Sequence, residues 1–428
     1  MIRVNEALFI SAASSREVAA QLERHDPLAG YRQRFVIADP RVCYLDGNSL
    51  GRLPVASAAA VEQAVHEEWR GDLVGSWPGV WLERLDRVAA LIANITGALP
   101  PEVVLGDSVT VNLYKVVGAF TASRAGRPDI LSERGNFPTD LYALARLAES
   151  AGGRLRLTPP EPGPAAVAAA LDEARGAIGV ACFSAVDYRS ARLAEVEAIT
   201  RVCAARDTPL VWDLSHAAGV VELGLHAAGV DAAVGCTYKY LNGGPGAPAF
   251  IFVHERHHDR GAPPMDGWMG HADVFAMEDR FRPAPGVGRF RLGTPPMLSV
   301  SALEPALEMI VEAGLKAIRA KSLALTGLAL ALADAWLAPH GVTVATPRDP
   351  ARRGAHVALL HADAFRVTRE LIERHAVVPD FREPDVIRVG LSPLTTSFSE
   401  VWDGLDRLRQ CLAAGAYRQR GERRTRVT

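Results

Sequence analysis

Lysine is scarce in this sequence. Lys and Arg together number 47 among 428 residues, yet the only lysines are Lys115, Lys239, Lys316 and Lys321. Three of them fall in segments with the pattern of helices, whereas Lys239 sits in a short apolar run, 234–244, that ends in glycines. Arginine stays charged in proteins, while a partly buried lysine can lose its proton and become a nucleophile. Lys239 is therefore a candidate for amine chemistry, such as a Schiff base to a carbonyl compound; the equal alternative is a buried stem with a solvated head.

Cysteine is also sparse and shows no CxxC spacing. The five cysteines are an odd number, which argues for free thiols in a reducing compartment and against a disulfide framework or a zinc site. We therefore predict a cytoplasmic protein without a structural metal. These positions are Cys43, Cys182, Cys203, Cys236 and Cys411.

Long hydrophobic runs and a strong net charge are absent as well. No segment has 18 uncharged apolar residues, and residues 1–6 lack the apolar stretch of a signal peptide, so we expect neither a membrane span nor a leader. The formal net charge is −2, which gives no field that would attract nucleic acid or anionic lipid. The exception is the tail at 418–426, with five arginines and one acid, which is typical of a solvated terminus and less often of a contact site.

The pattern between residues 103 and 253 predicts an α/β domain. Short apolar strands at 129–132, 178–185, 210–212, 232–237 and 249–253 alternate with helices at 139–151, 165–174 and 193–207. This alternation favours a largely parallel sheet covered on both faces. Amphipathic helices are predicted before it, at 61–70 and 81–96, and residues 263–296, rich in Pro and Gly, predict long functional loops after it.

The C-terminal part predicts a smaller α+β unit. Residues 303–337 have a helical pattern with a break near Gly314. Strands are predicted at 342–345, 356–361 and 386–389, with helices at 364–375 and 399–413. The predicted organisation is an N-terminal segment, 1–50, that packs with the small domain, a large α/β domain, 51–295, and a small domain, 296–428.

Two ionisable residues lie at the ends of predicted strands. Asp213 comes after the strand at 210–212, and Lys239 follows another strand 26 residues later. Ligands of such sheets bind at the carboxyl ends of the strands. A pyridoxal enzyme needs a lysine for the cofactor aldehyde and an acid that keeps the pyridine nitrogen protonated. A helix N-cap is the alternative role for Asp213, and the one we would prefer without Lys239.

Other residues suit a phosphorylated ring and an amino-acid substrate. Residues 107–112 open a helix, where backbone N–H groups form an anion site, although capping residues are common there. Phe137 could lie flat on a ring and Asp140 could touch its polar edge, but a simple turn before a capped helix is locally the more common reading. Arg388 in an apolar strand matches a substrate carboxylate or forms an internal salt bridge.

Together these motifs resemble the kynureninase family, whose members are pyridoxal-phosphate enzymes. The resemblance spans about residues 40 to 400 and rests mainly on four stretches, of which the first and third are long and specific. They are Tyr44-Leu45-Asp46-Gly47-Asn48-Ser49-Leu50-Gly51, Trp212-Asp213-Leu214-Ser215-His216-Ala217, Cys236-Thr237-Tyr238-Lys239-Tyr240-Leu241-Asn242-Gly243-Gly244-Pro245-Gly246 and Gly267-Trp268-Met269-Gly270-His271. The resemblance implies pyridoxal-phosphate fold type I, the aspartate-aminotransferase-like α/β fold.

The resemblance also implies roles for individual residues. Lys239 would bind the cofactor aldehyde, Asp213 would pair with the pyridinium nitrogen, and Tyr238 would act as a general acid and base. Arg388 would bind the substrate carboxylate. Further cofactor contacts would come from Val109, Thr110, Phe137, Asp140, Ser184, His216, Tyr238, Trp268 and Thr294, and further substrate contacts from Asn48 and Asp72.

The implied reaction is hydrolysis of L-kynurenine to anthranilate and L-alanine, by cleavage of the Cβ–Cγ bond. The family consists of homodimers with sites at the subunit interface, so Trp268 and Thr294 would serve the neighbouring subunit. Thr294 stands where some members have Asn, and Asp72 or its neighbours stand where some animal members have His. The second departure favours kynurenine over 3-hydroxykynurenine. The implied setting is tryptophan and kynurenine metabolism, including NAD biosynthesis.

Three other interpretations are open. A cysteine desulfurase-like lyase of the same fold would need a mobile-loop cysteine near the site, and neither Cys236 nor Cys411 is so placed. A non-enzymatic pyridoxal-binding regulator would carry a DNA-binding module, and no such module is visible. An inactive homologue is opposed by the presence of Asp213, Tyr238, Lys239 and Arg388.

Overall fold

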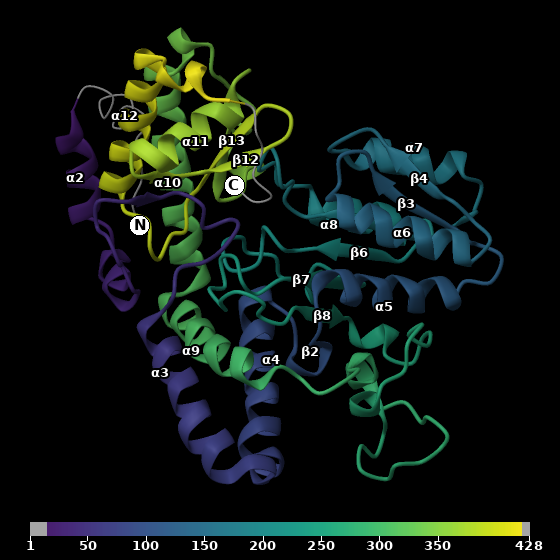
Figure 1. Cartoon of the computed structure of the whole chain (residues 1–428). Helices are drawn as coiled ribbons and strands as arrows, with labels where there is room; N and C mark the ends of the chain where they lie inside the picture. The colour runs from purple at the N-terminus through teal and green to yellow at the C-terminus, as the bar shows by residue number, and fades with distance from the viewer. Residues whose placement is uncertain (1–14, 422–428) are drawn as a thin grey trace. The chain divides into compact units, whose positions relative to one another are not determined.

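A computed structural model describes residues 15–421, which form two compact units (Figure 1). The larger unit comprises Ala56–Tyr188 and Ala194–Glu312, and the smaller one the residues up to Val55, Arg189–Leu193 and the residues from Ala313 onward. The sequence stretch discussed as a leader, 1–6, and the last arginines of the tail, from 423 on, lie outside the described residues.

A seven-stranded sheet organises the larger unit. Its order is β2-β8-β7-β6-β5-β3-β4, and the strands from β7 to β4 pair in parallel, while β8 runs antiparallel to both neighbours. Most of these strands are buried along their whole length because helices cover both faces, which explains why they read as apolar runs. Their bounds are β2 (Val103–Leu105), β3 (Asp129–Glu133), β4 (Leu155–Thr158), β5 (Ile178–Ser184), β6 (Leu210–Asp213), β7 (Ala232–Gly235) and β8 (Phe250–Val253).

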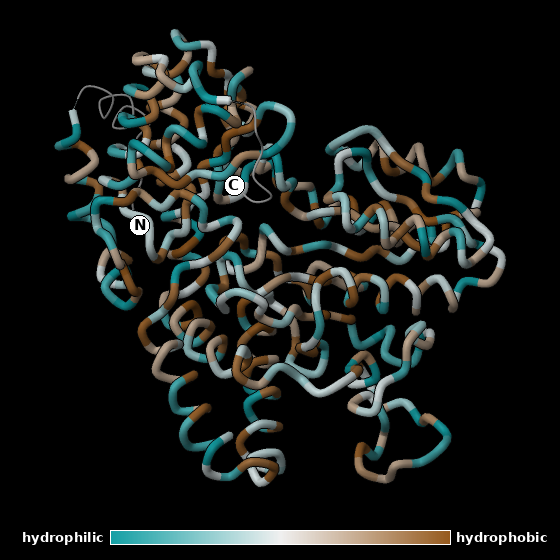
Figure 2. The backbone as a smooth tube through the Cα atoms, viewed as in Figure 1, coloured by the Kyte–Doolittle hydropathy of each residue, from teal (hydrophilic) through white to brown (hydrophobic). Residues whose placement is uncertain are grey.

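The helices of this unit alternate with the strands. Helices α5 and α6 pack together on one face of the sheet, and α7 and α8 pack together on the other. Figure 2 shows hydrophobic and hydrophilic residues alternating along such helices, as expected for elements with one buried side. The bounds are α3 (Val55–Gln63), α4 (Leu82–Thr96), α5 (Val109–Ala122), α6 (Pro138–Ser150), α7 (Pro164–Glu173), α8 (Val196–Ala204) and α9 (Met297–Ala313).

The prediction of a helix at 61–70 needs correction. Helix α3 ends at Gln63, and the chain continues as a π-helix, η2 (Ala64–Asp72), a short 3-10 turn and a second π-helix, η4 (Trp77–Trp81). The buried Glu68 side chain accepts hydrogen bonds from Trp81 Nε1 and the Arg84 guanidinium, and its carbonyl accepts from Ser76 Oγ. These contacts fold the segment back on itself, which an amphipathic pattern alone does not indicate.

The smaller unit is built on an antiparallel sheet of order β12-β13-β10-β9. A separate parallel pair joins β1 (Cys43–Tyr44) to β11 (Val377–Val378), so N-terminal residues contribute to the same core as the C-terminal helices. The remaining bounds are β9 (Thr343–Val344), β10 (His356–Leu360), β12 (Asp380–Arg382), β13 (Val386–Gly390), α2 (Arg16–Arg24), α10 (Leu315–Trp336), α11 (Ala364–Arg374) and α12 (Phe398–Ala414).

The fold class and most element positions predicted from the sequence agree with the structure. The parallel strands, the break between α9 and α10 at Gly314 and the helix-poor loops at 263–296 are all present. The five cysteines are free and buried. Among the helices described, none is long and apolar enough to cross a bilayer. Arg420, near the end of the described chain, pairs with Glu370 and Glu373, so this part of the tail is anchored rather than solvated.

A buried ion pair connects α10 to the N-terminal segment. Lys321 Nζ lies 2.6 Å from Asp26 Oδ2, with both side chains almost completely buried, and the contact lies outside hydrogen-bond geometry. We predict that Lys321→Met lowers the free energy of unfolding by about 3–5 kcal/mol, because it leaves the Asp26 carboxylate buried without its counter-ion. Denaturation in urea would measure this.

Two further variants control that measurement. Lys316→Met removes an exposed lysine from the same helix, so its effect should stay within about 0.5 kcal/mol. Asp26→Asn combined with Lys321→Met removes both charges and should recover most of the loss. If Lys321→Met is as stable as the parent chain, the ion pair does not contribute to the stability of the fold.

Candidate active site

A cavity of about 460 Å³ opens in the larger unit at the carboxyl ends of the parallel strands. The segments that follow β3, β5, β6 and β7 form much of its wall, and the start of α5 and the loop at 291–296 complete it. Among the lining residues are ten of the eleven positions that the sequence analysis assigned to the cofactor. These are Val109, Thr110, Phe137, Asp140, Ser184, Asp213, His216, Tyr238, Lys239 and Thr294.

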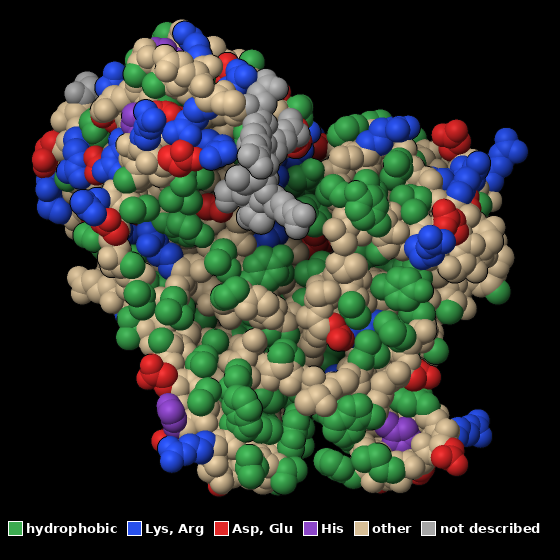
Figure 3. Space-filling view, in the orientation of Figure 1, with side chains coloured by type: hydrophobic (Ala, Val, Ile, Leu, Met, Phe, Trp, Pro, Cys, Tyr) green, Lys and Arg blue, Asp and Glu red, His purple; other side chains and the backbone are tan. Residues whose placement is uncertain are grey.

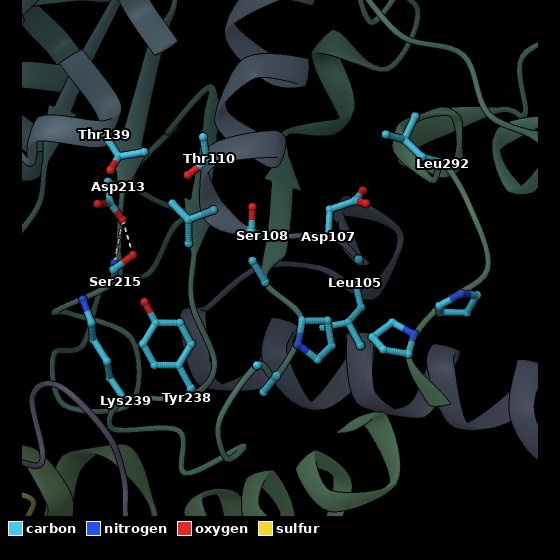
Figure 4. Close-up of a pocket in the computed structure, with 18 of the residues that line it drawn as sticks. Leu105, Asp107, Ser108, Thr110, Thr139, Asp213, Ser215, Tyr238, Lys239 and Leu292 are labelled. Carbon is cyan, nitrogen blue, oxygen red and sulfur yellow. Dashed lines mark hydrogen bonds between the residues drawn. The ribbon is translucent and has the colours of Figure 1, made fainter. Parts of the chain in front are cut away.

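Lys239 is half-buried and projects into this cavity. In Figure 4 the Lys239 and Tyr238 side chains lie side by side and extend toward Asp213 and Ser215. Lys239 Nζ lies 3.0 Å from His216 Nε2 and 5.9 Å from the centre of the Tyr238 ring. A tight turn after β7 fixes this placement, since the Asn242 N–H donates to the Lys239 carbonyl at 3.0 Å and Asn242 adopts a φ of 56°. An amine held beside an imidazole and a phenol is suited to proton transfer.

Two carboxyl groups lie beside the lysine. Asp213, at the end of β6, accepts hydrogen bonds from Ser215 N–H (2.8 Å) and Ser215 Oγ (2.6 Å) through one oxygen. The helix N-cap considered from the sequence is not present, because no helix follows β6; Asp213 instead closes a turn with Ser215 and lines the cavity. Asp140 in the first turn of α6 is only 2% exposed. Burial, followed by the charge of Asp213 and a hydrogen bond with it, raises the pKa of Asp140 well above its usual value.

The aromatic wall of the cavity begins where α6 starts. Phe137 keeps 39% of its surface exposed and meets Tyr188 edge to face, with ring centres 5.3 Å apart. Asn136 orders this corner, because its Oδ1 accepts from the Phe137 N–H (2.7 Å) and from Ser184 Oγ (2.8 Å). Asn136 and Tyr188 were not assigned to the site from the sequence. Asn136 directly precedes Phe137 and could have been found with it, whereas Tyr188 is distant in sequence and only the fold brings it to Phe137.

The start of α5 forms the anion-binding end of the cavity. Ser108 caps the helix by accepting from the Val111 N–H at 3.4 Å, and Val109 and Thr110 form the first turn. Free backbone N–H groups and the helix dipole at such a terminus favour a phosphate. Figure 4 shows Ser108 and Thr110 on the wall of the pocket with Asp107 beside them.

Four predicted site residues lie outside the residues that line the cavity. Trp268 is partly exposed in the loop at 263–296, with its ring 6.2 Å from that of Phe275, and Asp72 is exposed at the end of η2. Asn48 and Arg388 belong to the smaller unit. Arg388 is 1% exposed, pairs with Asp380 and donates to Ser49 Oγ, so the internal salt bridge considered from the sequence is present. Asn48 is fully buried, and its amide makes no hydrogen bond within the described residues.

Glu102, His226 and His254 also bring potential metal ligands together, away from this cavity. The carboxylate of Glu102 accepts from the backbone N–H groups of Leu99 (2.9 Å) and Glu255 (3.0 Å) and lies 2.9 Å from His226 Nδ1. The two imidazole rings stack at 4.7 Å with 23° between their planes. The contacts within this cluster satisfy the buried carboxylate of Glu102.

The cavity residues fit a pyridoxal phosphate cofactor. A lysine amine, a carboxylate, an exposed aromatic face and a helix N-terminus supply partners for its aldehyde, ring nitrogen, ring face and phosphate. One Asp140 oxygen is buried without a hydrogen-bond partner in the described residues, as expected at a place completed by a polar ligand.

Comparisons of sequence point to one family. The family described as "Kynureninase C-terminal domain" matches residues 318–408. The kynureninase of Pseudomonas fluorescens is 39% identical over 406 residues, which cover 93% of this chain and 96% of that protein. The kynureninase of Burkholderia mallei (strain SAVP1) is also 39% identical, over 94% of this chain and 97% of that protein.

Comparisons of structure confirm the fold. A cysteine desulfurase from Thermococcus onnurineus NA1 superposes with a TM-score of 0.73 at 16% identity, covering 92% of this chain and 96% of that one. A mutant of C-DES with glycine covalently linked to its PLP cofactor gives 0.78 at 17% identity, covering 88% and 98%. At such identities the likeness concerns the fold alone.

The raised pKa of Asp140 yields a prediction about pH. A carboxyl group whose pKa rises on folding weakens the fold above its unfolded pKa of about 3.8. Asp140→Asn should therefore stabilise the fold relative to the parent chain, and by more at pH 8 than at pH 5. The difference in free energy of unfolding should grow by up to about 1.4 kcal/mol per pH unit over the titrating range. Urea denaturation of the cofactor-free proteins at the two pH values would test this. A gain that is equal at both values would mean that Asp140 is ionised in the folded chain.

Proposed function

The chain belongs to the kynureninase family, and we propose that it hydrolyses L-kynurenine to anthranilate and L-alanine with pyridoxal phosphate as its cofactor. The 39% identity to kynureninases, over almost the full length of both proteins, is the observation that carries this proposal. The cavity supports it, because the lysine, acid, aromatic face and anion site that the reaction needs all line the same space.

Several residues of this chain would hold the cofactor. Lys239 would bind the aldehyde, Asp213 would pair with the ring nitrogen, Phe137 would stack on the ring, and the first turn of α5 would bind the phosphate. His216 and Ser215 hold Lys239 and Asp213 in place through the contacts at 3.0 Å and at 2.6–2.8 Å. When bound, pyridoxal phosphate holds the substrate amino group and accepts electrons released next to it.

Proton transfers fall to two neighbouring residues. The Lys239 amine, once free, removes the proton from the substrate Cα. Tyr238 moves a proton at the γ-carbonyl oxygen as water adds to that carbon and the Cβ–Cγ bond breaks. A positioned acid or base of this kind contributes about 10²–10⁴-fold to the rate.

The substrate carboxylate is assigned to Arg388, with Asn48 as a second contact. The guanidinium fork matches a carboxylate in two hydrogen bonds. Since Arg388 is paired with Asp380, the substrate would share the guanidinium with that acid. We assign unsubstituted kynurenine as the preferred substrate. Asp72 stands where some animal members of the family have His, so this chain has no imidazole there to bind a 3-hydroxyl group.

We further propose a cytoplasmic homodimer that acts in tryptophan and kynurenine metabolism, including NAD biosynthesis. Five buried free thiols suit a reducing compartment. Figure 3 shows hydrophobic side chains gathered on the visible face of the larger unit, and exposed apolar residues occur in the segment around η2 and η4 and in the loop that holds Trp268. Exposed apolar surface of this kind is typical of an interface, and Trp268 and Thr294 would then serve the neighbouring subunit.

The cofactor and the substrate can be tested separately. The purified protein with pyridoxal phosphate should absorb in the visible range and release fluorescent anthranilate from kynurenine. Lys239→Ala should lose the activity by more than about 10³-fold, because both the covalent anchor and the base are removed. Absence of visible absorbance would contradict the cofactor assignment. A coloured protein that releases no anthranilate would support the cofactor assignment and contradict the substrate assignment.

Arg388→Lys tests the carboxylate assignment. A lysine keeps the charge beside Asp380 but lacks the planar fork, so KM for kynurenine should rise by about 10–100-fold with the visible absorbance unchanged. Arg382→Lys is the matched control, because Arg382 pairs with the same Asp380 at 2.9 Å but is more exposed. Equal kinetic effects of the two changes would assign Arg388 to structure alone.

A further inference from the structure

We propose that Lys115 is a positioning residue for the cofactor phosphate: it neutralises Asp107 and so keeps the start of α5 able to bind an anion. This inference rests on the assignment of pyridoxal phosphate as the cofactor. Neither Lys115 nor Asp107 belongs to the residues that the family resemblance assigned to the site, and Lys115 is not among those that line the cavity.

Lys115 is enclosed by two acceptors inside the larger unit. It lies on α5, is 1% exposed, and its Nζ is 2.7 Å from Asp107 Oδ2 and 2.7 Å from the carbonyl oxygen of Phe290. Burial lowers the pKa of Lys115, and the adjacent Asp107 opposes that shift. The charge of this lysine is thus sustained by its ion pair.

Asp107 is an unfavourable residue at an anion site. It lines the cavity directly before Ser108, which caps α5, and it adopts a φ of 53°, in the left-handed region that Asp tolerates better than most residues other than glycine. A bare carboxylate here would repel a phosphate at the first turn of the helix and cancel part of the attraction of the helix dipole. Because the ammonium of Lys115 lies against this carboxylate, the pair presents little net charge to the phosphate.

Lys115 also connects two walls of the cavity. Residues 105–110 form one wall and residues 291–296 the other, and the Phe290 carbonyl directly precedes the second. One ammonium bonded to both sides fixes their separation. An arginine would bring a larger, planar group into a space closed by two acceptors, which explains a lysine here in a chain that otherwise prefers arginine.

The test measures binding of pyridoxal phosphate and of phosphate-free pyridoxal by visible absorbance. Lys115→Met removes the charge and keeps the stem, and it should weaken pyridoxal phosphate binding by about 10–100-fold while pyridoxal changes by less than about 3-fold. Asp107→Asn should bind pyridoxal phosphate as tightly as the parent protein or more tightly. The double variant should return to within about 3-fold of Asp107→Asn, since no unpaired charge is left. Lys316→Met, an exposed lysine in the smaller unit, is the control and should change neither ligand.

Each other outcome decides against the inference. Parent-like binding of pyridoxal phosphate by Lys115→Met would remove the role, and equal losses for both ligands would make Lys115 a structural residue only. If Lys115→Met does not fold, the double variant replaces it, and a loss of phosphate-dependent binding relative to Asp107→Asn would overturn the charge argument. If the parent protein binds no pyridoxal phosphate, the cofactor assignment and this inference are both wrong. If it binds the cofactor but does not act on kynurenine, only the substrate assignment is wrong.

Discussion

Two carboxyl groups share one buried corner of the site, and the rest of the cavity depends on how their charge is divided. Asp140 lies in α6, which follows β3, and Asp213 is the last residue of β6, so two carboxyl groups that repel each other when both are ionised meet there. Ser215 donates two hydrogen bonds to Asp213, whereas one oxygen of Asp140 has no hydrogen-bond partner within the described residues. Burial and the neighbouring Asp213 raise the pKa of Asp140, so the site disfavours a second negative charge beside Lys239 and His216. The parallel strand order brings these groups together, because the carboxyl ends of β3, β5, β6 and β7 lie at the same edge of the sheet.

The sequence predicts the residues whose role depends on their own segment. Asp213 could be found because it lies at the end of an apolar strand, Lys239 because it comes soon after one, and Phe137 because it precedes a helix. Residues whose role depends on distant partners gave no such signal. Tyr188 contacts Phe137 only because the fold brings these two distant residues together. Asn136 accepts a hydrogen bond from Ser184, which belongs to another part of the chain, at the end of β5. For the same reason the pairing of β1 with β11 and the π-helices after α3 could not be predicted from local patterns.

The fold alone would not have separated this chain from its nearest rival interpretation. Cysteine desulfurases share the architecture over about nine-tenths of the chain, and the C-DES lyase does so with a linked PLP cofactor. A scaffold of this kind hosts several chemistries, and the difference lies in the groups that reach the cofactor. Desulfurase chemistry needs an accessible thiol, whereas all five cysteines here are buried. Burial raises the pKa of Cys182 and of Cys236, which keeps these thiols protonated and unreactive.

The scarcity of lysine has a different meaning in the structure than in the sequence. Rarity singled out Lys239, but Lys115 and Lys321 are buried more deeply, although each lies in a helix of ordinary pattern. Both place a single ammonium against an acid, where a compact donor on a flexible stem fits and a planar fork does not. Arginine supplies many of the surface ion pairs, where its fork can bond two oxygens of one carboxylate, although Arg388 is buried against Asp380. Two of the four lysines, Lys115 and Lys321, therefore lie in enclosed places that need one small cation, whereas Lys239 is a half-buried amine that lines the cavity.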